Sequence, residues 1–304
     1  MKTETMHIAC NIDSKYTRFC GVLMVSLFEN NRDEHLKMHI LCYHLTDENK
    51  EDLQEIATRY NNDIQFYDID ETIFKGFPIS DQWPIVIYFR LMLPELLDKN
   101  IIKVLYLDCD ILCRGNLNEL FSTKMGDNAI CATEDILSRF PALYNRLGYH
   151  PSYNYFNSGV LLINVAKWKE LELTKKCINY IVSNKVRHPD QDALNAILFD
   201  KKMILDSRWN YISNYHTRYI SKEEYEEDLF KTKTYFPIFI HFTGTKPWSN
   251  LCDSPFKREW FSYQNKTKWK DMIPSHSIKQ IIVYRTALLL DAIGIRRYNK
   301  QKLF

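Results

Sequence analysis

Short apolar runs alternate with segments of helical periodicity along the first 248 residues of the chain. Apolar runs bounded by polar residues predict buried strands, and apolar residues three or four positions apart predict helices. Strands are expected at 7–12, 35–45, 64–67, 103–107, 129–133, 156–164, 203–205 and 238–242. Helices are expected at 19–28, 47–60, 84–97, 168–184 and 190–199. This alternation predicts an α/β fold with a mostly parallel sheet in one domain.

Local signals support the starts of two of these helices. Thr46 precedes 47–60, whose first turn carries acidic residues, as expected for a capped helix whose dipole favours negative charge at this end. Pro84 stands at the start of 84–97, where its missing amide hydrogen is tolerated.

Two carboxylates follow the apolar run at 104–107. Asp108 and Asp110 are separated by one residue and stand at the carboxyl end of the expected strand, where ligands of open α/β sheets collect. Such a pair suits a hard divalent cation that also holds a phosphate. Acids after strands are also common in ordinary turns, so the pair alone is a weak signal.

A second apolar run ends in polar chemistry at 239–248. His241 offers a nitrogen ligand suited to Mn²⁺ beside carboxylates. Gly244 allows the backbone to approach a ligand, and Lys246 supplies a positive charge for phosphate. The alternative is a core histidine followed by a turn. Together with the acid pair, this segment predicts a site for a metal and a phosphate.

Composition restricts the class of protein. Hydrophobic residues make up 45% and charged residues 26% of the 304 positions, which is ordinary for a globular protein, and the net charge of +2 gives no reason to expect a nucleic-acid partner. The chain has only 8 glycines and no Gly-x-Gly-x-x-Gly, so neither a Rossmann dinucleotide site nor a phosphate-binding P-loop is supported.

Eight cysteines are present, and several fall in or beside expected strands. The first seven residues lack the apolar segment of a secretory signal, so reduced thiols and a cytoplasmic location are expected. Cys109 and Cys113 do not make a zinc pair, because no second pair of suitable spacing follows. No apolar run reaches the ~20 residues needed to span a bilayer.

Six ordered motifs between residues 7 and 248 together resemble those of family 8 glycosyltransferases, of the bacterial lipopolysaccharide galactosyl- and glucosyltransferase type. The motifs are HIACNIDSKY at 7–16, YFRL at 88–91, VLYLDCD at 104–110, YFNSGVLLIN at 155–164, DQDALN at 190–195 and FIHFTGTKPW at 239–248. The resemblance implies a GT-A-like fold, with a single α/β domain at 1–248 that transfers a sugar from a nucleotide. The character of the chain changes after Trp248, and a C-terminal extension with a helix is expected at 249–304.

The resemblance also implies roles for individual residues. The metal ligands would be Asp108, Asp110 and His241. The donor contacts would be Asn11, Asp13 and Tyr16 at uracil, with Arg90, Asp108, Asp110, Asn157, Ser158, Gly244 and Lys246 at the phosphates and sugar. The catalytic residues would be Gln191, Asp135 and Asp190. Glu134 is a rival to Asp135, and one of Asp190 and Asp192 is expected to cap the helix while the other contacts a sugar hydroxyl.

The implied activity is a Mn²⁺-dependent, retaining transfer of galactose or glucose from a UDP-sugar to a cell-surface polysaccharide, lipopolysaccharide or lipid-linked glycan, with Mg²⁺ as the alternative cation. Gln191 is an amide and a poor nucleophile, which favours attack from the face that the leaving group occupies. The rival functions are a non-catalytic nucleotide-sugar binder and a sugar-nucleotide pyrophosphorylase, which should carry a glycine-rich loop that 7–21 lacks.

Two departures from the family pattern stand out. Only one residue separates Gly244 from Lys246, which leaves the reach of the lysine open. Residues 84–87, Pro-Ile-Val-Ile, stand where relatives often carry Ser or Thr, so the acceptor cannot be carried over.

The C-terminal segment has a different character. Apolar residues recur through 277–295 and are followed by a basic cluster at 296–302. This pattern suits an amphipathic helix that binds an anionic membrane at the cytoplasmic face. The alternative is a helix that packs against the domain.

Overall fold

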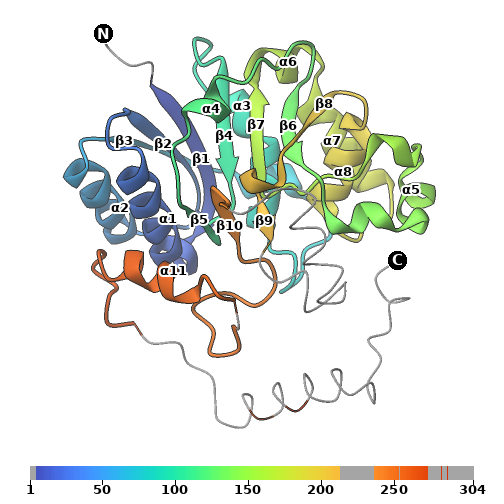
Figure 1. Ribbon diagram of the computed structural model, residues 1–304. Helices are drawn as coiled ribbons and strands as arrows, with labels where there is room; N and C mark the ends of the chain where they lie inside the picture. The colour runs from blue at the N-terminus through green and yellow to red at the C-terminus, as the bar shows by residue number, and fades with distance from the viewer. Residues whose placement is uncertain (1–4, 213–235, 253, 273–281, 283–285, 287–304) are drawn as a thin grey trace.

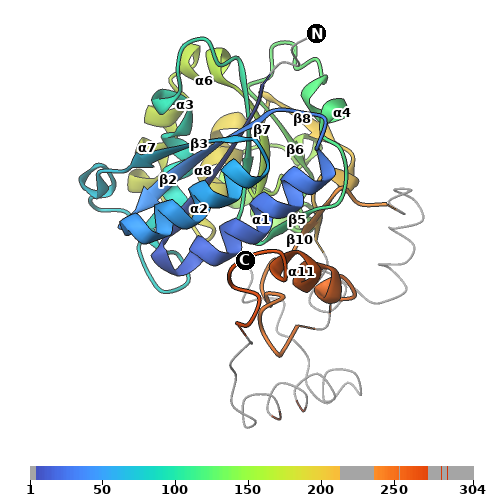
Figure 2. The same cartoon turned by 90° about the vertical axis from the view of Figure 1, so that its left-hand side faces the viewer.

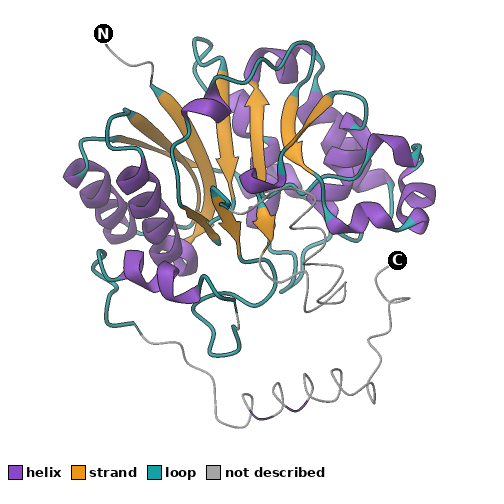
Figure 3. Ribbon diagram, viewed as in Figure 1, coloured by secondary structure: helices purple, strands orange, loops and turns teal. Residues whose placement is uncertain are grey.

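The computed structural model describes residues 5–212, 236–252 and 254–272, with single positions at 282 and 286. A seven-stranded sheet forms its centre, and helices cover both faces (Figures 1 and 3). The strands of this sheet are β1 (Met6–Asp13), β2 (Leu36–Tyr43), β3 (Asp63–Asp68), β4 (Lys103–Leu107), β6 (Ile130–Thr133), β7 (Val160–Asn164) and β8 (Lys202–Leu205). The order is β3-β2-β1-β4-β7-β6-β8. Only β7 runs antiparallel to its neighbours, so the expected mostly parallel sheet is confirmed.

The described helices are α1 (Thr17–Asn30), α2 (Asp47–Arg59), α3 (Leu93–Leu96), α4 (Asn118–Phe121), α5 (Pro141–Leu147), α6 (Val165–Glu170), α7 (Leu173–Ser183), α8 (Pro189–Leu198) and α11 (Lys257–Gln264). Short 3₁₀ turns lie between them, at η1 (Ser14–Tyr16), η2 (Glu71–Phe74), η3 (Ile85–Leu91), η4 (Ile136–Arg139), η5 (Pro151–Tyr153) and η6 (Ser207–Trp209).

The alternation of side chains along the strands divides the core into two layers. On β1, Ile8 and Cys10 pack with residues of α1 and α2, whereas Ala9 packs with residues of η3, α7 and α8 on the opposite face. Figure 2 shows α1 and α2 in front of the sheet and α7 and α8 behind it. Both faces are buried, which explains why the strands read as nearly continuous apolar runs.

A second, three-stranded sheet in the order β5-β10-β9 stands beside the first. Its strands are β5 (Ile111–Cys113), β9 (Tyr211–Ile212) and β10 (Phe239–His241). The expectation that 238–242 completes the main sheet is therefore wrong. Strand β4 is already hydrogen-bonded on both sides, to β1 and β7, so it has no free edge for another strand. The chain turns after β4, and the next strand, β5, pairs with β10 instead.

Three expected elements are interrupted. The helix expected at 84–97 is η3 followed by the single turn α3, because Pro94 lacks an amide hydrogen and cannot continue a longer helix. The helix expected at 168–184 divides into α6 and α7 at Glu172, whose φ of 51° is left-handed. Strand β7 begins only at Val160.

Local capping is confirmed at α2. The Thr46 side chain accepts a hydrogen bond from the Asn49 amide while the Asn49 side chain accepts one from the Thr46 amide.

The described part of the C-terminal extension packs against the domain. Trp260 of α11 is buried in the same core layer as α1. Trp269 lies so close to Gly21 of α1 that a Cβ there would sit 2.3 Å from its ring. The boundary at 248 stays a prediction.

Most of 277–304 lies outside the described residues, and so does the helix expected there. Within the part of the chain that is described, no helix combines the length and apolarity needed to cross a membrane. All eight cysteines are buried, and none of them forms a disulfide bond.

Candidate active site

A cavity of about 530 Å³ opens where β1 and β4 end, beside the small sheet. Every residue to which the sequence analysis gave a metal, donor or catalytic role lines it. They are Asn11, Asp13, Tyr16, Arg90, Asp108, Asp110, Asp135, Asn157, Ser158, Asp190, Gln191, His241, Gly244 and Lys246. Segments far apart in the sequence therefore supply one site.

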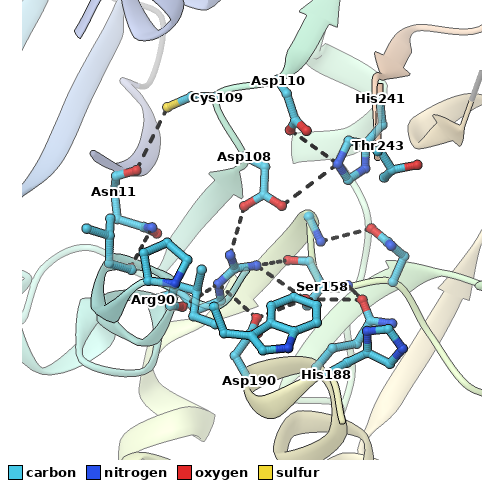
Figure 4. Close-up of a pocket in the computed structure, with 18 of the residues that line it drawn as sticks. Asn11, Arg90, Asp108, Cys109, Asp110, Ser158, His188, Asp190, His241 and Thr243 are labelled. Atoms are coloured by element: carbon cyan, nitrogen blue, oxygen red, sulfur yellow. Dashed lines mark hydrogen bonds and ion pairs between the residues drawn. The ribbon is translucent and has the colours of Figure 1, made fainter. Parts of the chain in front are cut away.

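The small sheet brings His241 to the acid pair. In the antiparallel register of β5 and β10, His241 is opposite Ile111, and the Phe242 amide donates to the Asp110 carbonyl at 3.0 Å. The His241 Nε2 atom lies 3.3 Å from Asp110 Oδ1 and 3.8 Å from Asp108 Oδ2 (Figure 4).

These three residues fit a divalent cation. One ligand atom from each lies within 4.8 Å of the others, so a single ion can contact all three. Two carboxylates and an imidazole suit Mn²⁺. Gly159 leaves the necessary room, because a Cβ at this position would sit 2.3 Å from His241 Cε1 and 2.9 Å from Asp108 Oδ2.

Lys246 reaches the metal ligands despite the short spacing after Gly244. Its ammonium group pairs with Asp110 Oδ2, and Gly244 adopts a left-handed φ of 72° in the turn before it. Burial by itself raises the pKa of Asp110, but the Lys246 ammonium beside it holds that pKa well below its usual range. Asp110 is therefore ionised and ready to bind a cation.

Arg90 joins Asp108 at one side of the cavity to Asp190 at the other. It is buried in η3, with Nη2 2.9 Å from Asp108 Oδ1 and Nε 3.2 Å from Asp190 Oδ2. It also donates to the Ser158 carbonyl at 2.8 Å, and its guanidinium lies 4.5 Å from the ring centre of Tyr106. Burial by itself lowers the pKa of Arg90, whereas Asp108 and the other acids around it raise that pKa above its ordinary value.

Asp190 and Gln191 lie in the first turn of α8 and face Ser158. Asp190 accepts from the Ser158 hydroxyl at 3.1 Å, and burial raises its pKa although Arg90 opposes the rise. Gln191 Oε1 accepts from the Ser158 amide at 2.9 Å, and its Nε2 is 3.4 Å from Asp135 Oδ2. Both side chains are held rather than free to rotate.

The expectation that Asp190 or Asp192 caps the helix is wrong, because His188 occupies the N-cap position of α8. Asp192 is instead fully buried outside the cavity lining. It accepts from the Arg187 and His188 amides at 2.8 and 3.1 Å and pairs with Arg146, so it holds the loop that enters α8.

The residues expected to hold uracil lie at the end of β1. Asp13 accepts from the Tyr16 amide at 3.0 Å and caps η1. Asn11 donates to the Val86 carbonyl at 2.7 Å, while its buried Oδ1 atom has no hydrogen-bond partner among the described residues. A ligand N–H group that reached this atom through the cavity wall would satisfy it. The Tyr16 ring packs edge-on against Phe19.

The structure places Glu134 and Asp135 differently, and the choice of Asp135 as the sugar-binding acid stays a prediction. Asp135 is buried at the cavity wall, whereas Glu134 is exposed and bonds to Asn154.

Sequence reasoning missed several cavity residues and one supporting residue. Trp83 and His188 line the cavity with their rings edge to face at 5.4 Å. Asn210 is buried behind His241, with its Oδ1 2.9 Å from His241 Nδ1, and its NH₂ group donates to Asn157 Oδ1 at 2.9 Å. A tryptophan near a loop could have been found as a sugar platform, but nothing in the pattern around Asn210 marks it.

Comparison with known proteins agrees with this geometry. The family model described as "Glycosyl transferase family 8" matches residues 7–252. A lipopolysaccharide 1,2-glucosyltransferase of Escherichia coli is 31% identical, with 98% of this chain and 92% of that protein covered. The lipopolysaccharide glucosyltransferase WaaO of Escherichia coli K12 is 30% identical, with 89% and 82% covered.

A solved structure shares the fold. The galactosyltransferase LgtC, in complex with donor and acceptor sugar analogs, superposes with a TM-score of 0.77 at 26% identity, covering 90% of this chain and 98% of that one. The GT-A-like fold is therefore confirmed. With the family match over most of its length, the chain belongs to glycosyl transferase family 8 and is a glycosyltransferase.

Proposed function

We propose that this protein is a retaining hexosyltransferase that transfers glucose or galactose from a UDP-sugar to a glycan of the cell-surface polysaccharide or lipopolysaccharide type. The observation that carries the proposal is one cavity lined by Asn11, the Asp108–Asp110–His241 group and the Asp190–Gln191 turn. These three groups suit the base, the diphosphate and the sugar of a nucleotide sugar, respectively.

The diphosphate end depends on charge. Asp108, Asp110 and His241 would hold Mn²⁺, with Mg²⁺ as the alternative. When bound, the cation supplies Lewis-acid stabilisation of the negative charge that grows on the departing diphosphate. The Lys246 ammonium pairs with Asp110, so it could also reach the oxygens of a diphosphate held by the cation. It would add a second positive charge beside the departing diphosphate.

The base end is supported by the unpaired Asn11 Oδ1 atom, which can accept the imide N–H of uracil. Tyr16 offers a ring face beside it, and Asp13 offers a further acceptor.

Retention is what the resemblance to the family implies, and the way the carboxylates at the sugar end are held argues against reaching it through a covalent intermediate. Asp190 is engaged by Arg90 and Ser158, and Asp192 is fully buried against Arg146. Gln191 carries an amide. None of these groups suits covalent attack on the sugar carbon, so we favour same-face substitution. The bond from the sugar to the phosphate oxygen breaks, the acceptor oxygen bonds to the same face of that carbon, and the hydroxyl proton passes to the departing phosphate oxygen.

The test is release of UDP from UDP-glucose and UDP-galactose, with Mn²⁺ and with EDTA. Mn²⁺-dependent turnover of one of them is expected, and Asp110→Asn should lower it by orders of magnitude without unfolding the protein. UDP should stabilise the fold only when Mn²⁺ is present, by about 2.7 kcal/mol at 100 times the dissociation constant. Full activity in EDTA, or wild-type turnover in Asp110→Asn, would contradict the proposal.

The rival functions predict other results. A non-catalytic binder would show Mn²⁺-dependent binding of UDP-sugar without UDP release, and it is disfavoured because the metal ligands and Lys246 are all in place. A pyrophosphorylase would form UDP-sugar from UTP and sugar phosphate. It is disfavoured by the missing glycine-rich loop after β1.

We extend the proposal to the location of the protein. The basic and apolar pattern of 277–304 supports reversible contact with the cytoplasmic face of the membrane, near a lipid-linked or polysaccharide acceptor. Sedimentation with anionic vesicles that falls with added salt, and its loss from a chain that ends near residue 275, would support this contact. Equal sedimentation of the shortened chain would exclude it.

A further inference from the structure

We infer that Asn210 is a positioning residue that fixes the tautomer of His241, so that the Nε2 atom of the ring is bare and faces the two aspartates. The inference about the tautomer stands on hydrogen bonds alone. Its consequence for cation binding rests on the proposed function.

Four buried side chains form a continuous chain of hydrogen bonds from the sugar end of the cavity to the metal end. Asn157 Nδ2 is 2.9 Å from Asp135 Oδ2, Asn210 Nδ2 is 2.9 Å from Asn157 Oδ1, and His241 Nδ1 is 2.9 Å from Asn210 Oδ1. Each of the four residues is less than a tenth exposed. Water therefore cannot easily replace any of these partners, and each bond needs a donor and an acceptor in the correct places.

A backbone amide sets the direction of the whole chain. The Gly159 N–H lies 3.0 Å from the Asn157 side chain and can only donate, so the Asn157 atom that faces it is the oxygen Oδ1. Asn210 approaches the same oxygen and must present its NH₂ group. The other end of the Asn210 amide is then its oxygen, which can only accept. The Nδ1 atom of His241 must consequently carry the hydrogen.

The Asp135 end agrees with this assignment. Asp135 Oδ1 accepts from the Leu137 amide at 2.9 Å. Its Oδ2 faces the NH₂ group of Asn157, which is the end of that amide opposite the oxygen bonded to Gly159. Flipping the Asn157 amide would place two donors in contact at Gly159 and two acceptors in contact at Asp135. Flipping the Asn210 amide would place its oxygen against Asn157 Oδ1, so that two acceptors would meet there.

A hydrogen on Nδ1 determines the state of Nε2, the other nitrogen of the His241 ring. A neutral imidazole carries one hydrogen, and with that hydrogen on Nδ1 the Nε2 lone pair faces Asp108 and Asp110. This is the form that ligates a cation. Partners that orient a ligating histidine in this way typically change metal affinity 10- to 100-fold when they are removed.

The tautomer is tested directly in the metal-free protein. Histidines labelled with ¹⁵N are observed at high pH, where the rings are neutral, and the His241 signals are assigned by their loss in His241→Gln. A proton on Nδ1 is expected. A proton on Nε2 would overturn the inference, even if the protein proves to be a hexosyltransferase.

Three variants test the role of Asn210, with Mn²⁺ binding followed by electron paramagnetic resonance of the free ion. Asn210→Leu should lose the single tautomer and weaken Mn²⁺ binding 10- to 100-fold. Asn210→Asp keeps an acceptor for His241, although its second oxygen meets the acceptor Asn157 Oδ1, so it should keep the proton on His241 Nδ1 and recover part of that loss. The control Asn62→Leu removes another buried asparagine, which bonds to the Leu36 amide away from the cavity, and should leave Mn²⁺ binding unchanged.

The outcomes separate this inference from the proposed function. Wild-type Mn²⁺ affinity in Asn210→Leu, or an equal loss in Asn62→Leu, would overturn it. If the wild-type protein shows the Nδ1 proton, and Asn210→Leu loses it, but neither binds Mn²⁺, then the positioning by Asn210 stands and the metal part of the proposed function fails. If Asn210→Leu does not fold, the wild-type tautomer and Asn210→Asp still decide the question.

Discussion

Arg90 is the residue whose removal should expose the electrostatic balance of this site most clearly. Replacement by Met keeps the length of the side chain and removes the charge that faces both Asp108 and Asp190. It also removes the donors to the Ser158 and Ile87 carbonyls, at 2.8 and 3.0 Å. We expect Arg90→Met to fold and to be strongly destabilised.

The expected size follows from the burial of the partners. Breaking a buried ion pair by removing one member costs about 3–5 kcal/mol, because the other charge is left without compensation. Asp190 is in this position, with 5% of its surface exposed, whereas the Asp108 side chain is 26% exposed and can be partly hydrated. We therefore assign most of the loss to Asp190 and expect about 4 kcal/mol at pH 7, out of the ~5–15 kcal/mol that hold a typical domain together.

The loss should depend on pH in a defined direction. Burial already raises the pKa of Asp190, and without Arg90 that pKa should rise further. An acid whose pKa is higher in the folded state binds more protons there than in the unfolded state, so the stability that it contributes falls as pH rises through the window between the two values. The deficit of Arg90→Met should be largest near pH 7–8 and should shrink toward pH 4.

The assay is urea unfolding followed by tryptophan fluorescence at several pH values. Arg32→Met is the control, because Arg32 makes an exposed ion pair with Glu29, and little change is expected there. The double variant Arg90→Met with Asp190→Asn should regain part of the lost stability. A deficit under ~1 kcal/mol, a deficit that does not change with pH, or no recovery in the double variant would refute the reasoning.

Two further predictions concern the cavity and the sheet. Gly159→Ala should weaken Mn²⁺ binding at least ~10-fold in a paramagnetic-resonance titration, because the added Cβ would collide with His241 and Asp108. The control Gly126→Asn, in open space at a left-handed φ, should leave Mn²⁺ binding unchanged. Equal Mn²⁺ affinities of the two variants would contradict this prediction. Burial lowers the pKa of His39 to about 3, with His7 and Lys37 adding to the effect, so the unfolded chain takes up a proton near pH 6.5 that the folded chain refuses. Stability should therefore fall by as much as about 3 kcal/mol between pH 6.5 and pH 4 in urea titrations. His39→Gln should flatten this slope and the exposed His150→Gln should not, and an unchanged slope in His39→Gln would show that another group causes it.

Much of the fold is determined by signals that act over a few residues. The apolar run before Asp108 specifies a strand that is buried on both faces, and β4 begins and ends where the sequence predicted. Thr46 specifies the start of α2 because its side chain needs only the amide three residues away. The acid pair was also found from the sequence, because polar residues that directly follow a buried strand lie at the edge of the sheet where ligands collect. Other cavity residues, such as Arg90 and Gln191, were expected only through the resemblance to the family.

Contacts between distant segments were decided only by the tertiary structure. Lys246 and Asp110 are 136 positions apart, and their pairing depends on a small sheet that the apolar pattern assigned to the main one. The pattern states that a strand is buried but not which edge it joins, since any free edge satisfies its backbone. Asp190 and Asp192 look equivalent in the sequence, yet the turn of α8 places one in the cavity and the other against Arg146. Asn210 gives no local signal, because its importance lies in the direction of hydrogen bonds with residues that only the folded chain brings to it.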